Sequence, residues 1–356
     1  MLKENYNVIG VMSGTSLDGI DLAHIVLTFK DNKWGYTIHE CETVAYPKEW
    51  VSRLKDAIDL NNEELYILNK EYTLLLGTTI KEFIGRYGLK DIDAVCSHGH
   101  TILHQPKNGI TLQIGNLPGI ASIVNERVVC DFRVQDVQLG GQGAPLVPIG
   151  DRLLFANYDY CLNLGGFSNI SFEESGRRIA FDICAVNTVL NYYAGKLGYE
   201  YDAGGNIAAG GSNIPELFEA LSDLDYYSQS YPKSLGFEFV KQTILPLMEA
   251  VEAPPADKLR TFTEHIAYQI ANTILYKGEG SLLITGGGAY NTFLIARLQQ
   301  LLPHTRITVP NDKTIQFKEA LIFALLGVLK LRGEHNVLCS VTGAARDHSS
   351  GNVFLP

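Results

Sequence analysis

The stretch Gly10-Val-Met-Ser-Gly-Thr-Ser-Leu-Asp-Gly-Ile-Asp21 lies between two segments rich in β-branched and aliphatic residues. Residues 7–12 and 20–29 each predict a strand, and a small polar turn between two strands is typical of a hairpin. Ser, Gly and Thr at its tip suit a polyanion, because glycine lets backbone N–H groups approach closely and hydroxyls add donors. Asp18 and Asp21 would be costly beside a phosphate unless they hold Mg²⁺ or orient water. The turn therefore predicts a phosphate site, with an ordinary glycine turn as the alternative.

The same pattern returns in the second half of the chain. Residues 159–164, the turn Gly165-Gly166-Phe167-Ser168 and residues 169–172 again predict strand, turn and strand. Taken alone, Gly165-Gly166 is equally well explained as a simple turn. We interpret the repeat as a weak internal duplication, with a glycine-tipped hairpin at the start of each of two domains. The expected domains are residues 1–140 with about 335–356, and residues 141–334.

Helices and strands alternate through the rest of the chain. Hydrophobic periodicity predicts helices at 48–60, 63–87, 255–276, 291–302 and 317–332, and further strands at about 36–46, 93–96, 128–131, 178–181, 281–285 and 306–309. This alternation is typical of α/β sheets covered by helices.

A third glycine-rich turn, Thr285-Gly286-Gly287-Gly288-Ala289, follows an apolar strand and precedes a helix. Three glycines there would let a flat or charged ligand lie against the backbone at a helix N-terminus, although a tight turn explains them as well. Together with the two hairpins, the turn fits the plan of actin-like ATPases. In that plan two hairpins hold the phosphates and a glycine-rich turn holds the adenosine.

Three charged residues are candidates for chemistry. Asp182 follows the strand at 178–181, and a carboxylate on a rigid strand suits a general base, although it could instead cap the next helix. Arg133 could hold a phosphate or carboxylate with two hydrogen bonds, or pair with a neighbouring aspartate. Glu319, at the start of a long apolar helix, is also explained by the helix dipole.

Three histidines, His98, His100 and His104, lie at alternate or near-alternate positions and would share one face of a strand. A metal site is one interpretation, but no acidic residue lies beside them. We expect them to line a polar cleft instead.

The composition limits the class of protein. Hydrophobic residues make up 46% and charged residues 19% of 356, and the formal net charge is −10. An acidic chain argues against nucleic acid or an anionic membrane as the main partner. The six cysteines form no C-x-x-C pair, so buried thiols are expected rather than disulfides or zinc. With neither a signal peptide nor a spanning segment in view, we expect a cytoplasmic protein.

These segments together resemble the anhydro-N-acetylmuramic acid kinases. The resemblance runs from Gly10 to about Ala344 and rests on several motifs in a fixed order. Besides the opening stretch, they are Ser97-His-Gly-His-Thr101, Gln113-Ile-Gly115, Asp131-Phe-Arg133, Gly140-Gly-Gln-Gly-Ala-Pro-Leu-Val-Pro148, Phe181-Asp182, Pro232-Lys-Ser234, Gly286-Gly-Gly-Ala-Tyr-Asn291, Lys318-Glu-Ala320 and Val341-Thr-Gly-Ala344.

The resemblance implies a two-domain actin-like (ribonuclease H-like) ATPase fold with a central cleft that closes on its substrates. It also implies a reaction in which water opens 1,6-anhydro-N-acetylmuramic acid while ATP phosphorylates the freed O6, a step in peptidoglycan recycling. Asp182 would be the base, and Asp18 and Asp21 would hold Mg²⁺, directly or through water. Family members commonly form homodimers.

The remaining roles follow from the same motifs. The residues expected to bind ATP are Gly14, Thr15, Ser16, Leu17, Asp18, Gly19, Ile20, Asp21, Gly165, Gly166, Gly286, Gly287 and Gly288. Those expected to bind the sugar are Arg133, His98, Glu319 and Asn187.

Two positions depart from the family. Ile183-Cys184-Ala185-Val186 stands where the family usually has Thr-Gly-Pro-Gly, and His100 stands where Gln is common. A kinase for a different amino sugar is therefore one alternative. An Hsp70-like nucleotide-driven binding protein is another, although it would need a client-binding domain that we do not expect here. A metal hydrolase built on the three histidines is the third.

Overall fold

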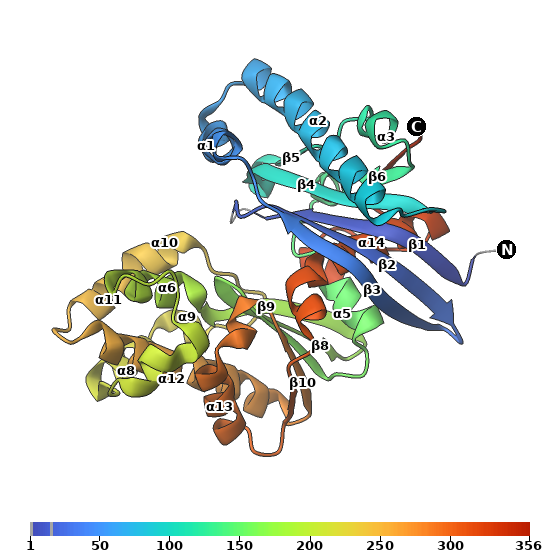
Figure 1. Cartoon of the computed structure of the whole chain (residues 1–356). Helices are drawn as coiled ribbons and strands as arrows, with labels where there is room; N and C mark the ends of the chain where they lie inside the picture. Colours follow the sequence, from blue (N-terminus) through green and yellow to red (C-terminus); the bar gives the residue numbers. More distant parts are fainter. Residues whose placement is uncertain (1–2, 15–16) are drawn as a thin grey trace. The chain divides into compact units, whose positions relative to one another are not determined.

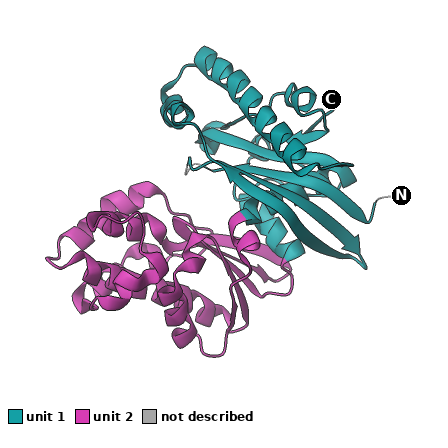
Figure 2. Ribbon diagram, in the orientation of Figure 1, with its two compact units in different colours: residues 1–154, 317–356 teal, residues 155–316 magenta. Residues whose placement is uncertain are grey.

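The computed structural model describes residues 3–14 and 17–356. The chain divides into two compact units, residues 1–154 with 317–356 (unit 1) and residues 155–316 (unit 2), coloured separately in Figure 2. The expected domain ranges, 1–140 with about 335–356 and 141–334, remain a prediction. Within the described ranges, no helix combines the length and the apolar character needed to cross a bilayer.

Unit 1 is built on a seven-stranded sheet in the order β12-β6-β4-β1-β2-β3, with β5 paired to β4 (Figure 1). β1, β2 and β3 form an antiparallel meander, and β4 and β6 extend the sheet in parallel from β1. Its strands are β1 Asn5–Ser13, β2 Ile20–Lys30, β3 Lys33–Val44, β4 Ala94–Gln105, β5 Ile110–Ile114, β6 Val128–Cys130 and β12 Asn352–Phe354.

Helices pack on both faces of this sheet because successive residues of β1 point to opposite sides. Ile9 and Val11 belong to the core that α2 covers. On the other side Gly10 lies against α14, where an added Cβ would come within 2.0 Å of the Ala320 carbonyl oxygen. The helices and 3₁₀ turns of unit 1 are α1 Lys48–Asp56, η1 Ala57–Asp59, α2 Asn62–Tyr87, η2 Pro106–Asn108, α3 Ile120–Val124, α4 Val134–Gln138, α5 Pro148–Leu154 and α15 Cys339–Thr342, with α14 Asp312–Arg332 beginning in unit 2.

Unit 2 repeats the plan with a five-stranded sheet in the order β11-β10-β7-β8-β9. Three antiparallel strands are again followed by two parallel ones on the side of the first strand. This is the strand order of the ribonuclease H-like fold, so the predicted α/β class is confirmed. The strands are β7 Tyr160–Leu164, β8 Phe167–Glu174, β9 Arg177–Ala185, β10 Ser281–Thr285 and β11 Arg306–Thr308.

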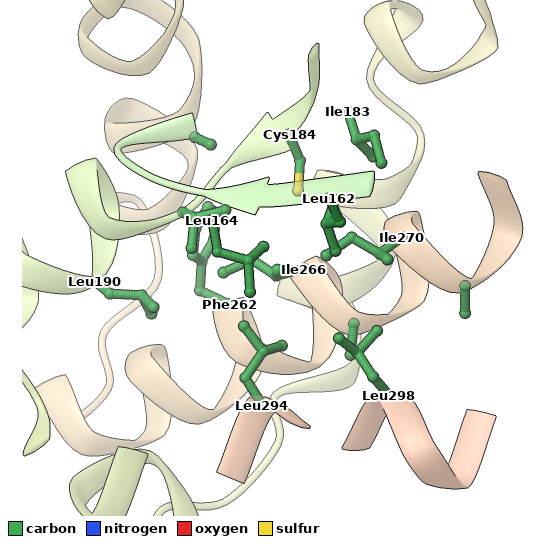
Figure 3. Close-up of a cluster of buried hydrophobic side chains, with 14 of the residues drawn as sticks. Leu162, Leu164, Ile183, Cys184, Leu190, Phe262, Ile266, Ile270, Leu294 and Leu298 are labelled. Atoms are coloured by element: carbon green, nitrogen blue, oxygen red, sulfur yellow. The ribbon is translucent and has the colours of Figure 1, made fainter. Parts of the chain in front are cut away.

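The core of unit 2 lies between this sheet and its helices. Figure 3 shows Leu162 and Leu164 of β7 with Phe262 and Ile266 of α12, and Leu294 of α13 beyond them, all buried. The helical segments are α6 Asn187–Lys196, η3 Ala203–Gly205, α7 Asn206–Gly210, α8 Pro215–Ser222, α9 Asp225–Ser228, α10 Phe237–Phe239, the π-helical turn η4 Val240–Ile244, α11 Leu245–Glu249, α12 Pro255–Lys277, η5 Gly287–Tyr290 and α13 Thr292–Leu301.

One expected boundary is wrong. The strand predicted to end at Asp182 continues as β9 to Ala185, because Ile183, Cys184 and Ala185 are apolar and buried. The next helix, α6, begins only at Asn187. Asp182 is therefore a residue inside a strand, and its alternative role as a helix cap is excluded.

Candidate active site

Asp182 lies on β9 opposite Asn169 of β8. The side-chain amide of Asn169 donates to its Oδ1 at 2.9 Å, and the backbone N–H of Leu235 donates to Oδ2 at 2.9 Å. The hydroxyl of Tyr226 donates to its backbone carbonyl at 2.6 Å. Each carboxylate oxygen thus has one fixed donor and keeps a lone pair with which it can accept a proton.

Burial raises the pKa of Asp182 above its usual value, while the bonds from Leu235 and Asn169 act against this rise. A carboxylate whose pKa has moved toward neutrality is a stronger base than an ordinary aspartate. Asp182 is therefore a carboxylate of fixed orientation whose pKa lies above that of an ordinary aspartate.

The segment after Asp182 is part of the sheet. Cys184 pairs with Ser168 of β8, whose hydroxyl accepts from the Cys184 N–H and donates to its carbonyl, both at 3.1 Å. Val186 closes the segment by donating its N–H to the Gly166 carbonyl at 2.8 Å. Where the family usually has two glycines, this chain therefore has a buried, hydrogen-bonded strand end.

The glycines of unit 2 gather where the parallel strands β7 and β10 end. Gly165 and Gly166 follow β7, and Gly286 follows β10 with a φ of 83°. A Cβ at Gly286 would lie 2.8 Å from the Leu164 carbonyl oxygen, and one at Gly288 would lie 2.7 Å from the Leu164 Cβ. These two turns are in contact, so the structure brings together residues that the sequence predicted as separate nucleotide contacts.

Asn187 connects the same turns. Its side-chain amide donates to the Leu164 carbonyl at 3.3 Å, and its backbone N–H donates to the Gly165 carbonyl at 3.3 Å. A Cβ on Gly287 would lie 3.8 Å from its Nδ2. Asn187 thus connects the two glycine turns, and its contact with the sugar stays a prediction.

In unit 1, the hairpin between β1 and β2 includes Gly14 and residues 17–19, while the predicted contacts Thr15 and Ser16 lie outside the described residues. Leu17 has a φ of 61°, and its N–H donates to the Gly14 carbonyl at 3.4 Å. A Cβ on Gly19 would meet the Val44 carbonyl oxygen at 2.5 Å, so β3 requires glycine there. Ile20 begins β2 and is buried.

Two carboxylates stand beside this hairpin. Burial raises the pKa of Asp21, the hydroxyl of Thr43 lowers it by donating to Oδ1 at 2.6 Å, and the charge of Asp18 raises it again. Two neighbouring carboxylates suit a divalent cation, because oxygen ligands of this kind are those that Mg²⁺ prefers.

Arg133 is oriented by His98. Its Nε donates to the His98 Nε2 at 2.8 Å, and its Nη1 donates to the Gly143 carbonyl at 2.8 Å. His98 Nδ1 lies 2.8 Å from the Gly99 carbonyl, so this nitrogen carries the proton. Burial and the charge of Arg133 lower the pKa of His98 well below its usual value, which keeps the ring neutral. His98 therefore positions Arg133.

The charge of Arg133 is matched by Glu319 of α14. Burial lowers the pKa of Arg133 to about 10, and the charges of Glu319 and Asp136 act against that decrease, so the guanidinium is charged at neutral pH. Desolvation by the surrounding protein raises the pKa of Glu319 although the residue keeps contact with solvent, while the charge of Arg133 lowers this pKa and that of Asp21 raises it. The charges of Arg133 and Glu319, the candidates for the sugar site, therefore interact with each other, and Glu319 also interacts with Asp21, a candidate for the metal site.

His100 belongs to a hydrogen-bonded chain that sequence reasoning missed. The hydroxyl of Ser13 lies 2.7 Å from the His100 Nδ1 and 2.6 Å from the Tyr46 hydroxyl, which in turn contacts the Tyr72 hydroxyl. Burial lowers the pKa of His100 to about 4. His104 is exposed, and within 3–14 and 17–356 no three His, Cys, Asp or Glu side chains gather to hold a metal.

Comparison with known proteins agrees with the resemblance. The family of anhydro-N-acetylmuramic acid kinases matches residues 6–356. A relative of that name from Shewanella sediminis is 33% identical and one from Sulfurovum sp. is 34% identical, over 99% and 100% of both chains. One solved structure, the (R)-2-hydroxyglutaryl-CoA dehydratase component A of Acidaminococcus fermentans, has a TM-score of 0.46 at 15% identity and covers 92% of this chain and 99% of its own. This chain belongs to the anhydro-N-acetylmuramic acid kinase family.

Proposed function

We propose that this protein uses ATP and water to convert 1,6-anhydro-N-acetylmuramic acid into N-acetylmuramic acid 6-phosphate, in the cytoplasm where ATP is available. Membership of the family over residues 6–356 supports the substrate and the reaction type. The observation that carries the mechanism is Asp182, a carboxylate of raised pKa that two donors hold on a rigid strand.

In the proposed reaction Asp182 takes a proton from water as the water oxygen bonds to the anomeric carbon. The bond between that carbon and O6 breaks, and O6 bonds to the γ-phosphorus of ATP while ADP leaves with the bonding electron pair. The substrate thus gains one water and one phosphoryl group. General-base catalysis of this kind contributes roughly 10²–10⁴-fold.

The nucleotide contacts proposed for unit 1 are Gly14 and residues 17–21, with Thr15 and Ser16 as further candidates outside the described residues. In unit 2 they are the turns at Gly165-Gly166 and at Gly286–Gly288, where glycine lets the Gly286–Gly288 turn pack closely against the end of β7. Asp18 and Asp21 would hold Mg²⁺, which when bound would neutralise phosphate charge.

The sugar contacts are proposed for Arg133 and Glu319. His98 and Gly143 occupy the Arg133 Nε and Nη1, so Nη2 remains for an anionic group such as the lactyl carboxylate. Glu319 would accept hydrogen bonds from sugar hydroxyls.

A coupled assay of ADP release with Mg·ATP and 1,6-anhydro-N-acetylmuramic acid tests this function, with the product mass checked for one added phosphate and one added water. Asp182→Asn removes the base without changing the size of the side chain, so we expect kcat to fall by at least ~100-fold with the fold retained. Asp223→Asn, at an exposed position of unit 2, is the matched control. Turnover by Asp182→Asn at the wild-type rate would refute the assignment. Nucleotide binding without turnover would point to a different amino sugar.

A further inference from the structure

A cavity lies in unit 2, apart from the residues assigned above. Its volume is about 330 Å³, and its walls include Arg260, Glu264 and Tyr268 of α12, Arg297 of α13 and Phe218 of α8. Small-molecule sites in proteins begin at roughly this size. None of these residues has a role in the proposed reaction.

The cavity carries a net positive charge. Arg260 donates from Nε to the Glu264 Oε1 at 3.0 Å, and Arg297 donates from Nε to the Glu264 Oε2 at 2.8 Å. One carboxylate is thus shared by two guanidinium groups. Arg297 alone would suffice to pair α13 with α12, so Arg260 adds an uncompensated charge in a chain whose formal net charge is −10.

Both arginines keep donors for a ligand. Arg260 uses Nη1 for the Ala209 carbonyl at 3.4 Å, and Arg297 uses Nη1 for the side chain of Gln300. Nη2 of each has no bond to any residue that the structure describes. The arginine side chains are 26% and 27% exposed, whereas that of Glu264 is 11% exposed. The carboxylate is therefore buried beneath guanidinium edges that solvent can reach.

The rest of the wall is apolar. The rings of Phe218 and Tyr268 meet edge to face at 5.4 Å, and Leu301 of α13 lines the same cavity. Arg260 also lies over the ring of Phe293 at 4.8 Å, which fixes the plane of its guanidinium. An occupant would therefore meet both cationic donors and aromatic or aliphatic groups.

We propose that this cavity is a second ligand site, which binds a small organic anion through Arg260 and Arg297 and packs an apolar part of it against Phe218, Tyr268 and Leu301. The anionic group is a carboxylate or a phosphate monoester, because both offer oxygens that match guanidinium N–H groups.

Isothermal titration calorimetry of the full chain at low ionic strength tests the site with phenyl phosphate and benzoate as probes. Saturating Mg·ADP is present throughout, so that the phosphate-binding turns of the kinase site are occupied. We expect saturable binding of at least one probe, and the stronger one identifies the anionic group. Benzyl alcohol, which has the ring without the charge, is expected not to bind. The absence of saturable binding of either anion would overturn the proposal.

Three substitutions distinguish a ligand site from a simple link between helices. Arg297→Gln should weaken binding by about tenfold or more, whereas Arg306→Gln, an arginine of unit 2 outside the cavity, should leave it unchanged. Glu264→Gln removes the competing carboxylate and should tighten binding several-fold. Equal binding by Arg297→Gln and wild type, or weaker binding by Glu264→Gln, would refute the site. If Arg297→Gln does not fold, Arg297→Lys takes its place in the comparison with wild type, beside Glu264→Gln.

Discussion

At the scale of single residues, hydrogen bonds decide what the charged groups of this protein can do. Arg133 has a defined direction because a neutral His98 accepts from its Nε and the Gly143 carbonyl accepts from its Nη1. Asn169 and Leu235 fix the orientation of the Asp182 carboxylate in the same way, by donating to its two oxygens. The sequence alone predicts these side chains as candidates, but their partners fix proton positions and orientation.

Asn169 should set the pH range in which Asp182 acts as a base. The base must be deprotonated, so activity is lost as pH falls through the pKa of Asp182, which lies above its usual value. The Asn169 amide stabilises the charged carboxylate. Its removal in Asn169→Ala should therefore raise that pKa and move the acidic limb of kcat/KM to higher pH. On the acidic side of this limb, we expect activity to fall by about tenfold for each unit by which the pKa of Asp182 rises.

A pH–rate profile of kcat/KM measures this shift. Asn191→Ala, at an exposed position of α6, is the matched control and should reproduce the wild-type profile. An acidic limb of Asn169→Ala that coincides with wild type, or moves to lower pH, would show that this bond does not tune the base.

At the scale of elements, Gly10 shows how closely β1 packs against α14, and Gly85 of α2 serves as a contrast. Gly10→Ala would place a methyl group 2.0 Å from the Ala320 carbonyl oxygen, so strand and helix must separate. We expect the free energy of unfolding to fall by about 1–3 kcal/mol or more, as overpacking usually costs.

Gly85→Ala provides the opposite result from the same substitution. Gly85 lies within α2 and nothing lies within 4 Å of its added Cβ, so alanine should stabilise the helix by ~0.5–1 kcal/mol. Urea unfolding of both variants measures the difference. Equal stability of Gly10→Ala and wild type would contradict the close contact between β1 and α14.

At the scale of the whole molecule, the six cysteines report on how tightly the interior of each unit is packed. None forms a disulfide, and Cys96, Cys130, Cys161 and Cys184 are buried, while Cys41 and Cys339 are partly accessible. Burial raises the pKa of Cys184 to about 12 and also raises those of Cys96 and Cys130, so these thiols stay protonated.

A colorimetric thiol reagent should therefore modify Cys41 and Cys339 first in the native protein. The four buried thiols should react only at the rate at which the unit around each of them unfolds locally. All six should react at once in denaturant. Rapid native reaction of four or more thiols, located by peptide mass analysis, would contradict the buried environments.

The sequence by itself determined the family and part of the secondary structure. The glycine-tipped hairpins, the long helices and the α/β class follow from local periodicity and turn residues, which act over a few neighbours. The family motifs pointed to Asp182, Arg133 and the glycine turns for the same reason, since each motif is a short continuous run of residues. Only tertiary structure decided that β9 continues to Ala185, because burial against β8 overrides a boundary inferred from Asp182.

The tertiary structure also decided what surrounds each functional group. Leu235 reaches Asp182, Asp21 raises the pKa of Glu319, and Arg297 meets Glu264 across long stretches of chain. No local pattern predicts such contacts, because they arise where separate elements pack. Desolvation and hydrogen bonds then shift pKa values and fix orientations. The sequence specified which groups are present, and packing of the folded chain specified their charge states and directions.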